Sequence, residues 1–313
     1  MPRYDGVVPI KVLLAAPRGY CAGVERAVDA VERALEIHGP PVYVRKQIVH
    51  NLHVVRDLEA KGAIFVEEEI EVPEGAVVVL SAHGVAPEVY ANARRRNLTV
   101  LDATCPLVTK VHLEARRFAG RDRTIVLIGH AGHEEVVGTT GQAPGRTILV
   151  QDVGEARTVQ VADPANLSYL TQTTLSVDET NEIVAVLRER FPAIEGPPRE
   201  DICYATQNRQ DAIKEVARRA DVVLVIGSDN SSNSNRLAEV ARELGTPAYL
   251  VDDESEVDAA WLEDVEVVGL TSGASAPERL VDRMLAWLAE HGATEIEEVR
   301  LAEERLRFSD VRV

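Results

Sequence analysis

Residues 10–39 read IKVLLAAPRGYCAGVERAVDAVERALEIHG, and this stretch decides the fold class. It opens with a continuous apolar run, Ile10–Ala16, which is typical of a strand covered on both faces of a sheet. After Cys21, apolar residues recur at helical spacing up to His38, and Gly39 supplies the usual stop signal. The stretch therefore predicts a strand, a loop that carries a cysteine, and a helix.

The same order of elements recurs along the chain. Further short apolar runs predict strands at residues 76–80, 124–128, 167–171, 221–226 and 265–270, and helical patterns separate them. Strands that alternate with helices form parallel sheets joined by right-handed crossovers. We therefore expect an α/β protein with parallel sheets.

The spacing of the three cysteines indicates an internal repeat. Cys21, Cys105 and Cys203 each lie just before or at the start of a helical pattern. A polar cluster at the end of a strand follows 28 or 29 residues later, at His50, His133 and Ser231, and a second follows 62 to 72 residues later, at His83, Thr173 and Ser275. This period predicts three small α/β units at residues 10–103, 104–200 and 201–292, with a C-terminal tail at 293–313.

Ligand groups of open α/β sheets gather at the carboxyl ends of the strands, beside the N-termini of helices. If the three units surround a pseudo-threefold axis, the cysteines converge on one cavity. A single cysteine is most often only a small buried apolar residue, but three equivalent positions disfavour that interpretation. Three thiolates suit a Cys₃ zinc site or a cubane iron–sulfur cluster with one open iron.

The polar clusters suit an anionic ligand. They supply many uncharged donors, and helix N-termini add backbone N–H groups, so a phosphate or diphosphate is favoured. The candidates are His50, His83, His133, Ser231, Ser232, Asn233 and Ser275. Glu135 is the best acid–base candidate. The alternatives are that Glu135 is only a solvated surface carboxylate, or that adjacent Glu134 has this role. The hydroxyl of Thr173 either passes a proton or only caps a helix.

The overall composition excludes several classes of partner. The 313 residues contain 34 Lys and Arg against 51 Asp and Glu, a formal net charge of −17, which disfavours nucleic acid and anionic membranes. The sequence shows no secretory signal and no apolar run of the length that a membrane helix needs. The few widely spaced cysteines do not resemble a disulfide framework, so we expect a cytoplasmic protein.

Long motifs distributed over residues 10–279 carry a family resemblance. They include PRGYCAGVERAV, IVHN, SAHGV, DATCPLVTKVH, GHAGHEEVVGTTGQ, TQTTLSVDET, ICYATQNRQ, GSDNSSNSNRL and SGASAP. With these motifs the chain resembles the 4-hydroxy-3-methylbut-2-enyl diphosphate reductases of the methylerythritol phosphate route to isoprenoids.

The resemblance implies a cofactor, a reaction and roles for the candidate residues. Cys21, Cys105 and Cys203 would each bind one iron of a central [4Fe–4S] cluster, whose fourth iron takes the C4 hydroxyl oxygen of the substrate. Glu135 matches the proton-relaying glutamate of the family, and Thr173 matches the threonine near the hydroxyl. The positions that match diphosphate-binding residues are His50, His83, His133, Ser231, Ser232, Asn233 and Ser275. The expected reaction removes that hydroxyl as water with two electrons from reduced ferredoxin or flavodoxin, giving isopentenyl and dimethylallyl diphosphates.

One departure and two alternatives remain at this point. Many family members carry proline where this chain has Glu134, so a second carboxylate lies next to Glu135. An aconitase-type dehydratase also uses three cysteines and one open iron, but it needs no external electrons. A non-enzymatic iron–sulfur or phosphate sensor would bind a ligand in the same cavity and signal.

Overall fold

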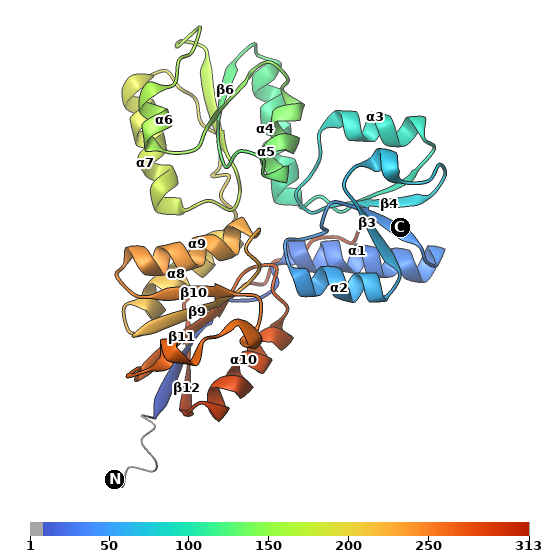
Figure 1. The fold of residues 1–313 in the computed structure, drawn as a ribbon. Coiled ribbons are helices and arrows are strands. Elements are labelled where there is room, and N and C mark those ends of the chain that lie inside the picture. Colours follow the sequence, from blue (N-terminus) through green and yellow to red (C-terminus); the bar gives the residue numbers. More distant parts are fainter. Residues whose placement is uncertain (1–8, 313) are drawn as a thin grey trace. The chain divides into compact units, whose positions relative to one another are not determined.

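Three parallel sheets organise the computed structural model, which describes residues 9–312 (Figure 1). Over residues 9–312 they contain five, four and three strands, and the neighbouring strands of each sheet are parallel. The predicted α/β class with three small parallel sheets is confirmed. All six strands predicted from apolar runs are present, with ends shifted by at most two residues.

The five-stranded sheet has the order β10-β9-β11-β1-β12. Its strands are β10 (Ala248–Val251), β9 (Val222–Ile226), β11 (Val267–Ser272), β1 (Ile10–Ala16) and β12 (Ala293–Arg300). Helices α8 (Tyr204–Ala217) and α9 (Ser232–Glu243) cover one face, and α10 (Glu278–Glu290) covers the other. Burial on both faces explains the continuous apolar runs of β9 and β1.

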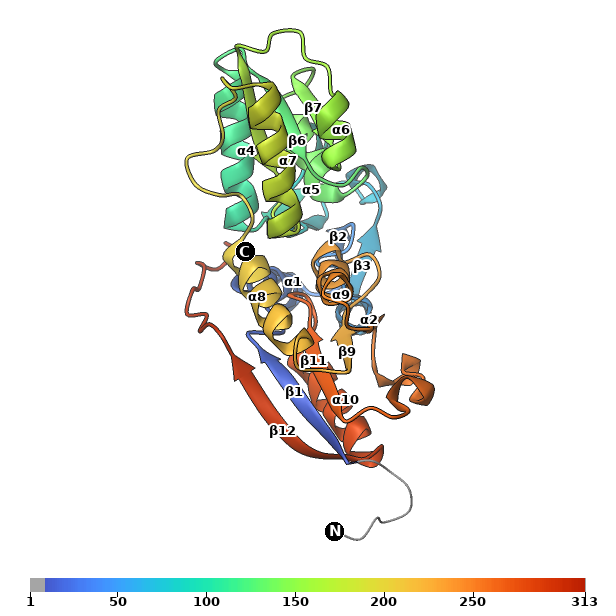
Figure 2. The ribbon, with the colours of Figure 1, turned by 90° about the vertical axis from the view of Figure 1, so that its left-hand side faces the viewer.

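Strand β1 belongs to this sheet rather than to the sheet of the residues that follow it. Val12 is paired with Val268 of β11 on one side and with Ile296 of β12 on the other, and Figure 2 shows β1 and β12 side by side. Residues 293–300, expected in the C-terminal tail, therefore form an edge strand. Its mostly exposed, charged sequence ATEIEEVR lacks the apolar run that marks an interior strand. The unit boundaries themselves stay a prediction.

The four-stranded sheet has the order β3-β2-β4-β5. Its strands are β3 (Ala63–Val66), β2 (Val42–Arg45), β4 (Val77–Leu80) and β5 (Thr99–Asp102). Helix α1 (Ala22–His38) buries its apolar stripe against β2 and β4, and α3 (Pro87–Arg95) lies on the opposite face. Helix α2 (Leu52–Ala60) and the short 3₁₀ turn η1 (Glu69–Glu71) complete this region.

The three-stranded sheet has the order β7-β6-β8, with β7 (Thr147–Val150), β6 (Thr124–Ile128) and β8 (Leu167–Thr171). Helices α4 (Pro106–Ala119) and α5 (Glu134–Gln142) pack on one face, and α6 (Val153–Thr158) and α7 (Val177–Arg190) pack on the other (Figure 1). The carboxyl ends of β6 and β8 lead into the two loops that hold His133 and Thr173.

By their internal contacts the described residues form two compact units. Unit 1 comprises residues 9–21, 50–54 and 204–306, with the five-stranded sheet, and unit 2 comprises residues 22–49, 55–203 and 307–312, with the other two sheets. Two short 3₁₀ turns, η2 (Glu254–Glu256) and η3 (Ala259–Leu262), also lie in unit 1. Over residues 9–312, none of the helices has both the length and the apolar character of a membrane span.

Candidate active site

Each of the three cysteines immediately precedes a helix. Cys21 precedes α1, Cys105 is the N-cap residue of α4, and Cys203 precedes α8. All three are partly exposed, and none of them forms a disulfide. Because the N-terminus of a helix carries partial positive charge, all three positions favour a negatively charged ligand. The local placement predicted from the sequence is therefore present at each cysteine.

A hydrogen bond ties the backbone of each cysteine to a polar loop at the end of a strand. The N–H of Cys105 donates to the carbonyl of Ala82 at 2.9 Å, and the N–H of Cys203 donates to that of Thr173 at 3.0 Å. In unit 1, the N–H of Cys21 donates to the carbonyl of Ala274 at 3.2 Å. Each polar loop thus holds the cysteine that follows it in the repeat, and the loop that holds Cys21 comes from the far end of the chain.

Glu135 and Thr173 form a hydrogen-bonded pair in unit 2. The backbone N–H of Thr173 donates to Oε1 of Glu135 at 2.7 Å, and the Thr173 hydroxyl donates to Oε2 at 2.9 Å. Both residues are buried. Burial raises the pKa of Glu135 to about 7, against the lowering effect of the two hydrogen bonds, and the charge of Asp201 raises it further. A carboxyl group with such a pKa both holds and gives up a proton near neutral pH.

His83 and His133 meet edge to face beside this pair. Their ring centroids are 5.7 Å apart, with an interplanar angle of 88°. Nδ1 of His133, the N-cap residue of α5, accepts a hydrogen bond from the N–H of Glu135 at 3.2 Å. Because Nδ1 accepts this bond, the neutral ring of His133 carries its proton on Nε2.

Two glycines of α5 allow the His83 loop to approach this closely. A Cβ atom at Gly141 would lie 2.4 Å from the Cβ of Ala86, and one at Gly138 would lie 3.2 Å from the carbonyl oxygen of Gly84. The side chain of Gln142 then donates to the carbonyl of Val85 at 2.9 Å. The sequence GTTGQ within α5 therefore joins two strand-end loops of unit 2.

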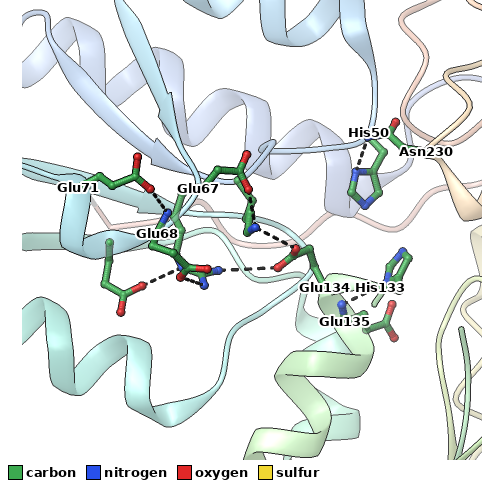
Figure 3. Close-up of polar contacts among 11 residues, drawn as sticks. His50, Glu67, Glu68, Glu71, His133, Glu134, Glu135 and Asn230 are labelled. Carbon is green, nitrogen blue, oxygen red and sulfur yellow. Dashed lines mark hydrogen bonds and ion pairs between the residues drawn. The ribbon is translucent and has the colours of Figure 1, made fainter. Parts of the chain in front are cut away.

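Glu134 lies on a different side of α5 from Glu135 (Figure 3). Its carboxylate oxygens lie 3.8 Å from Nη1 of Arg45 and 3.7 Å from Nζ of Lys46. These cations also pair with carboxylates around η1, Arg45 with Glu69 at 2.9 Å and Lys46 with Glu67 at 2.6 Å. The additional negative charge at the position before Glu135 is therefore balanced within a separate ionic network.

The hydroxyl and amide candidates gather at the carboxyl end of the sheet in unit 1. Ser231 is the N-cap of α9, Ser232 is its first residue, and Ser231 accepts a hydrogen bond from the N–H of Ser234 at 3.3 Å. Oδ1 of Asn233 accepts from the N–H of Ala274 at 2.8 Å, in the loop that also holds Cys21. This arrangement gives a helix N-terminus surrounded by uncharged polar groups, as the sequence predicted.

His50 joins this group within unit 1. Its carbonyl accepts a hydrogen bond from the hydroxyl of Ser275 at 2.8 Å, and its Nδ1 lies 3.4 Å from Nδ2 of Asn230 (Figure 3). Burial lowers the pKa of His50 to about 4, so the imidazole is neutral at neutral pH in the protein alone.

The sequence patterns did not single out two buried residues near the site, Asp201 and His112. Asp201 accepts a hydrogen bond from the N–H of Thr171 at 3.1 Å and from Nζ of Lys110 at 3.1 Å, and burial raises its pKa to about 6. His112 packs under the His83 loop, where its Cε1 would lie 2.7 Å from a Cβ at Gly84. The only available signal was position, because Asp201 is two residues before Cys203 and His112 lies in the motif after Cys105.

The three cysteines are soft donors of the kind that suit an iron–sulfur cluster or a zinc ion. Among residues 9–312, no three or more His, Cys, Asp or Glu side chains are close enough together to hold one ion. Locally, each cysteine precedes a helix, and a hydrogen bond from its backbone N–H fixes its place in the chain.

Three small parallel sheets, a cysteine before a helix in each repeat and a buried carboxyl group beside polar strand-end loops define the class as an α/β enzyme. The chain belongs to the LytB protein family, whose model matches residues 12–289. It is 66% identical to a 4-hydroxy-3-methylbut-2-enyl diphosphate reductase of Acidothermus cellulolyticus over 96% of this chain and 88% of that protein. It is 63% identical to the protein of the same name from Leifsonia xyli, over 96% and 89%.

Two solved structures share the fold. One is the E-1-hydroxy-2-methyl-but-2-enyl-4-diphosphate reductase from Plasmodium falciparum, with a TM-score of 0.93 and 38% identity over 97% of this chain and 96% of that chain. The other is an (E)-4-hydroxy-3-methyl-but-2-enyl diphosphate reductase described as the terminal enzyme of the non-mevalonate pathway. It has a TM-score of 0.62 and 31% identity over 90% of this chain and 99% of that chain.

Proposed function

We propose that the chain reduces (E)-4-hydroxy-3-methylbut-2-enyl diphosphate to isopentenyl and dimethylallyl diphosphates. The allylic C–O bond breaks, a C–H bond forms, and two electrons and two protons convert the hydroxyl group into water. The family and the names of its relatives support this reaction. The observation that carries it within the structure is the buried Glu135–Thr173 pair next to His133.

The three cysteines are the proposed ligands of the cofactor. Cys21, Cys105 and Cys203 would each hold one iron of a [4Fe–4S] cluster and leave the fourth iron to the substrate. When bound, such a cluster supplies single electrons and a Lewis-acidic iron next to the hydroxyl group. The protein contributes the orientation of the thiols through the carbonyls of Ala274 and Ala82 and that of Thr173.

The diphosphate would be held by uncharged donors. Nε2 of His133, the hydroxyls of Ser231, Ser232 and Ser275, and the amide of Asn233 suit phosphate oxygens, and the N-terminus of α9 adds its dipole. His50 and His83 complete the proposed set. Neutral His50 places no positive charge in the site of the protein alone, and a bound polyanion favours its protonation.

Glu135 would deliver the proton that turns the leaving hydroxyl into water. With a pKa of about 7, a substantial fraction of its carboxyl groups is protonated at neutral pH. The Thr173 hydroxyl donates to Oε2 of Glu135 at 2.9 Å and would connect this carboxyl group to the hydroxyl of the bound substrate. Thr173 would therefore align both the proton donor and the leaving group.

The remaining parts of the proposal concern partners and location. Reduced ferredoxin or flavodoxin would be the electron donor, and the reaction would take place in the cytoplasm. Neither the dehydratase nor the sensor alternative finds support among the relatives, which carry the reductase name.

The test is anaerobic turnover of the reconstituted protein with the hydroxylated diphosphate and a chemical reductant. We expect Glu135→Gln to bind the substrate with little change and to lower turnover about 10²- to 10⁴-fold, the usual contribution of a positioned acid. Glu134→Gln is the matched control, because its carboxylate belongs to the Arg45–Lys46 network, and it should retain turnover. Normal turnover of Glu135→Gln would refute the proton-transfer assignment, and activity without reductant would refute the reductase assignment.

A further inference from the structure

The C-terminal segment, residues 301–312, follows strand β12 and contains no helix or strand. Two of its side chains are nevertheless withdrawn from solvent: Val311 is 6% exposed, and the side chain of Glu304 is 13% exposed. Its neighbour Glu303 is 59% exposed and pairs with Arg305. Within this highly charged segment, the carboxylate of Glu304 is therefore much less exposed than that of its neighbour Glu303.

Glu304 pairs with a fully buried arginine in unit 1. Nη1 and Nη2 of Arg209, whose side chain has no exposed surface, donate to the two oxygens of Glu304 at 3.0 and 3.2 Å. Asn208 donates to Oε1 of Glu304 at 3.0 Å as well. A buried guanidinium is strongly unfavourable without such a partner, so Glu304 is needed for Arg209 to remain in place.

Arg209 also donates hydrogen bonds to two backbone carbonyls, one close to Cys21 and one close to Cys203 in the sequence. Nη2 donates to the carbonyl of Gly19 at 2.8 Å, two residues before Cys21. Nη1 donates to the carbonyl of Ala205 at 2.8 Å, two residues after Cys203. One side chain thus joins the Cys21 loop, the first turn of α8 and the C-terminal segment.

A second arginine repeats the arrangement in unit 2. Nε of Arg26, in α1, donates to the carbonyl of Ser309 at 2.9 Å, and Nη1 donates to the carbonyl of Thr104 at 3.0 Å. Thr104 immediately precedes Cys105. The C-terminal segment therefore contacts Arg209 and Arg26, each of which holds a peptide group close to a cysteine in the sequence.

We propose that the C-terminal segment is a positioning element for the cysteine loops, acting through Arg209 and Arg26. Glu304 orients Arg209, which holds Gly19 and Ala205, and the Ser309 carbonyl orients Arg26, which holds Thr104. The inference rests on the proposed function, because it requires that the cysteines hold a cluster. Contacts of this kind orient metal ligands and control how tightly the metal is kept.

The first experiment compares Glu304→Gln with its exposed neighbour Glu303→Gln in the full chain. Both proteins are reconstituted anaerobically, and iron and sulfide per chain and the rate of iron transfer to a chelator are measured. We expect Glu304→Gln to release iron about 10-fold faster than the unaltered protein, the lower end of the effect of outer-shell contacts on metal affinity. Glu303→Gln should match the unaltered protein.

A second set of variants separates positioning from folding. The double variant Arg209→Met with Glu304→Met removes the buried charges together, so it leaves no unpaired ion. We expect it to fold, as judged by denaturant unfolding of the cluster-free chain, and still to release iron rapidly. Arg26→Ala should also release iron faster, whereas Arg33→Ala should not, because Arg33 of the same helix pairs with Asp310 of the same segment at the protein surface.

The outcomes distinguish this inference from the proposed function. If the unaltered protein holds a cluster and reduces the diphosphate, but the Glu304 and Arg26 variants release iron at the unaltered rate, the positioning role is wrong and the proposed function stands. If the unaltered protein takes up no cluster, the proposed function fails and the inference fails with it.

Discussion

Thr173 holds both carboxylate oxygens of Glu135, one through its backbone N–H at 2.7 Å and the other through its hydroxyl at 2.9 Å. No cation appears among the groups that shift the pKa of Glu135. Burial therefore outweighs the two hydrogen bonds, and the group is poised to exchange a proton near pH 7. The contact joins helix α5 to the loop after strand β8, through two residues that are 38 positions apart in the sequence.

The Thr173 hydroxyl should affect both the rate and its pH dependence. Thr173→Val keeps the shape and the backbone bond but removes the hydroxyl, which stabilises the ionised carboxylate. We expect a further rise in the pKa of Glu135 and a loss of about tenfold or more in turnover, since a hydrogen bond to a charged group contributes about 1.5–3 kcal/mol. The measurement is turnover against pH, with Thr173→Ser as the control that keeps the hydroxyl. An unshifted profile for Thr173→Val would contradict this role.

The raised pKa of Glu135 should appear in the stability of the protein as a function of pH. The folded chain binds the proton more tightly than the unfolded chain, whose ordinary pKa is 4.5, so wild-type stability falls as the pH rises from about 4.5 to about 7. Glu135→Gln has no carboxyl group that titrates at this position, so its free energy of unfolding should not fall in this way. The free energy of unfolding of Glu135→Gln minus that of the wild type should therefore be about 3 kcal/mol larger at pH 8 than at pH 4. Urea unfolding of the cluster-free proteins at both pH values measures the difference. Parallel pH dependence in the two proteins would show that Glu135 titrates normally.

Removal of one thiol should remove the cluster and leave the fold. Cys105 is partly exposed, and its structural bond uses the backbone N–H, which Cys105→Ser retains. We expect the variant to unfold at nearly the same denaturant concentration as the unaltered cluster-free protein. After anaerobic reconstitution it should lack the brown cluster absorbance and most of its iron and sulfide. A full cubane spectrum in this variant would show that Cys105 is not a ligand.

The close approach of α5 to the His83 loop should not tolerate a side chain. A methyl group at Gly141 would lie 2.4 Å from the Cβ of Ala86, so Gly141→Ala should destabilise the fold by about 1–3 kcal/mol, as overpacking does. Because the loop must move, the affinity for the diphosphate should fall as well. Denaturant unfolding and substrate titration test both effects. Val137→Ala, on the exposed side of the same helix, is the control and should change neither.

Much of the fold followed from local pattern. Continuous apolar runs identified the strands at Ile10–Ala16 and 222–226, because these strands are buried on both faces. Short strands such as Thr99–Asp102 and the charged edge strand Ala293–Arg300 were not identified, because partial burial leaves no continuous run. The positions of the three cysteines before helices followed directly from the spacing of the repeat.

The sequence by itself determined the α/β class, the repeat and the chemical types gathered at the strand ends, because each depends on periodicity within a few tens of residues. Only the tertiary structure decided that β1 pairs with β11 and β12, that Glu134 belongs to the Arg45 network, and that Glu304 reaches Arg209. These contacts join residues up to about 280 positions apart, and their partners are chosen by burial and charge compensation in three dimensions.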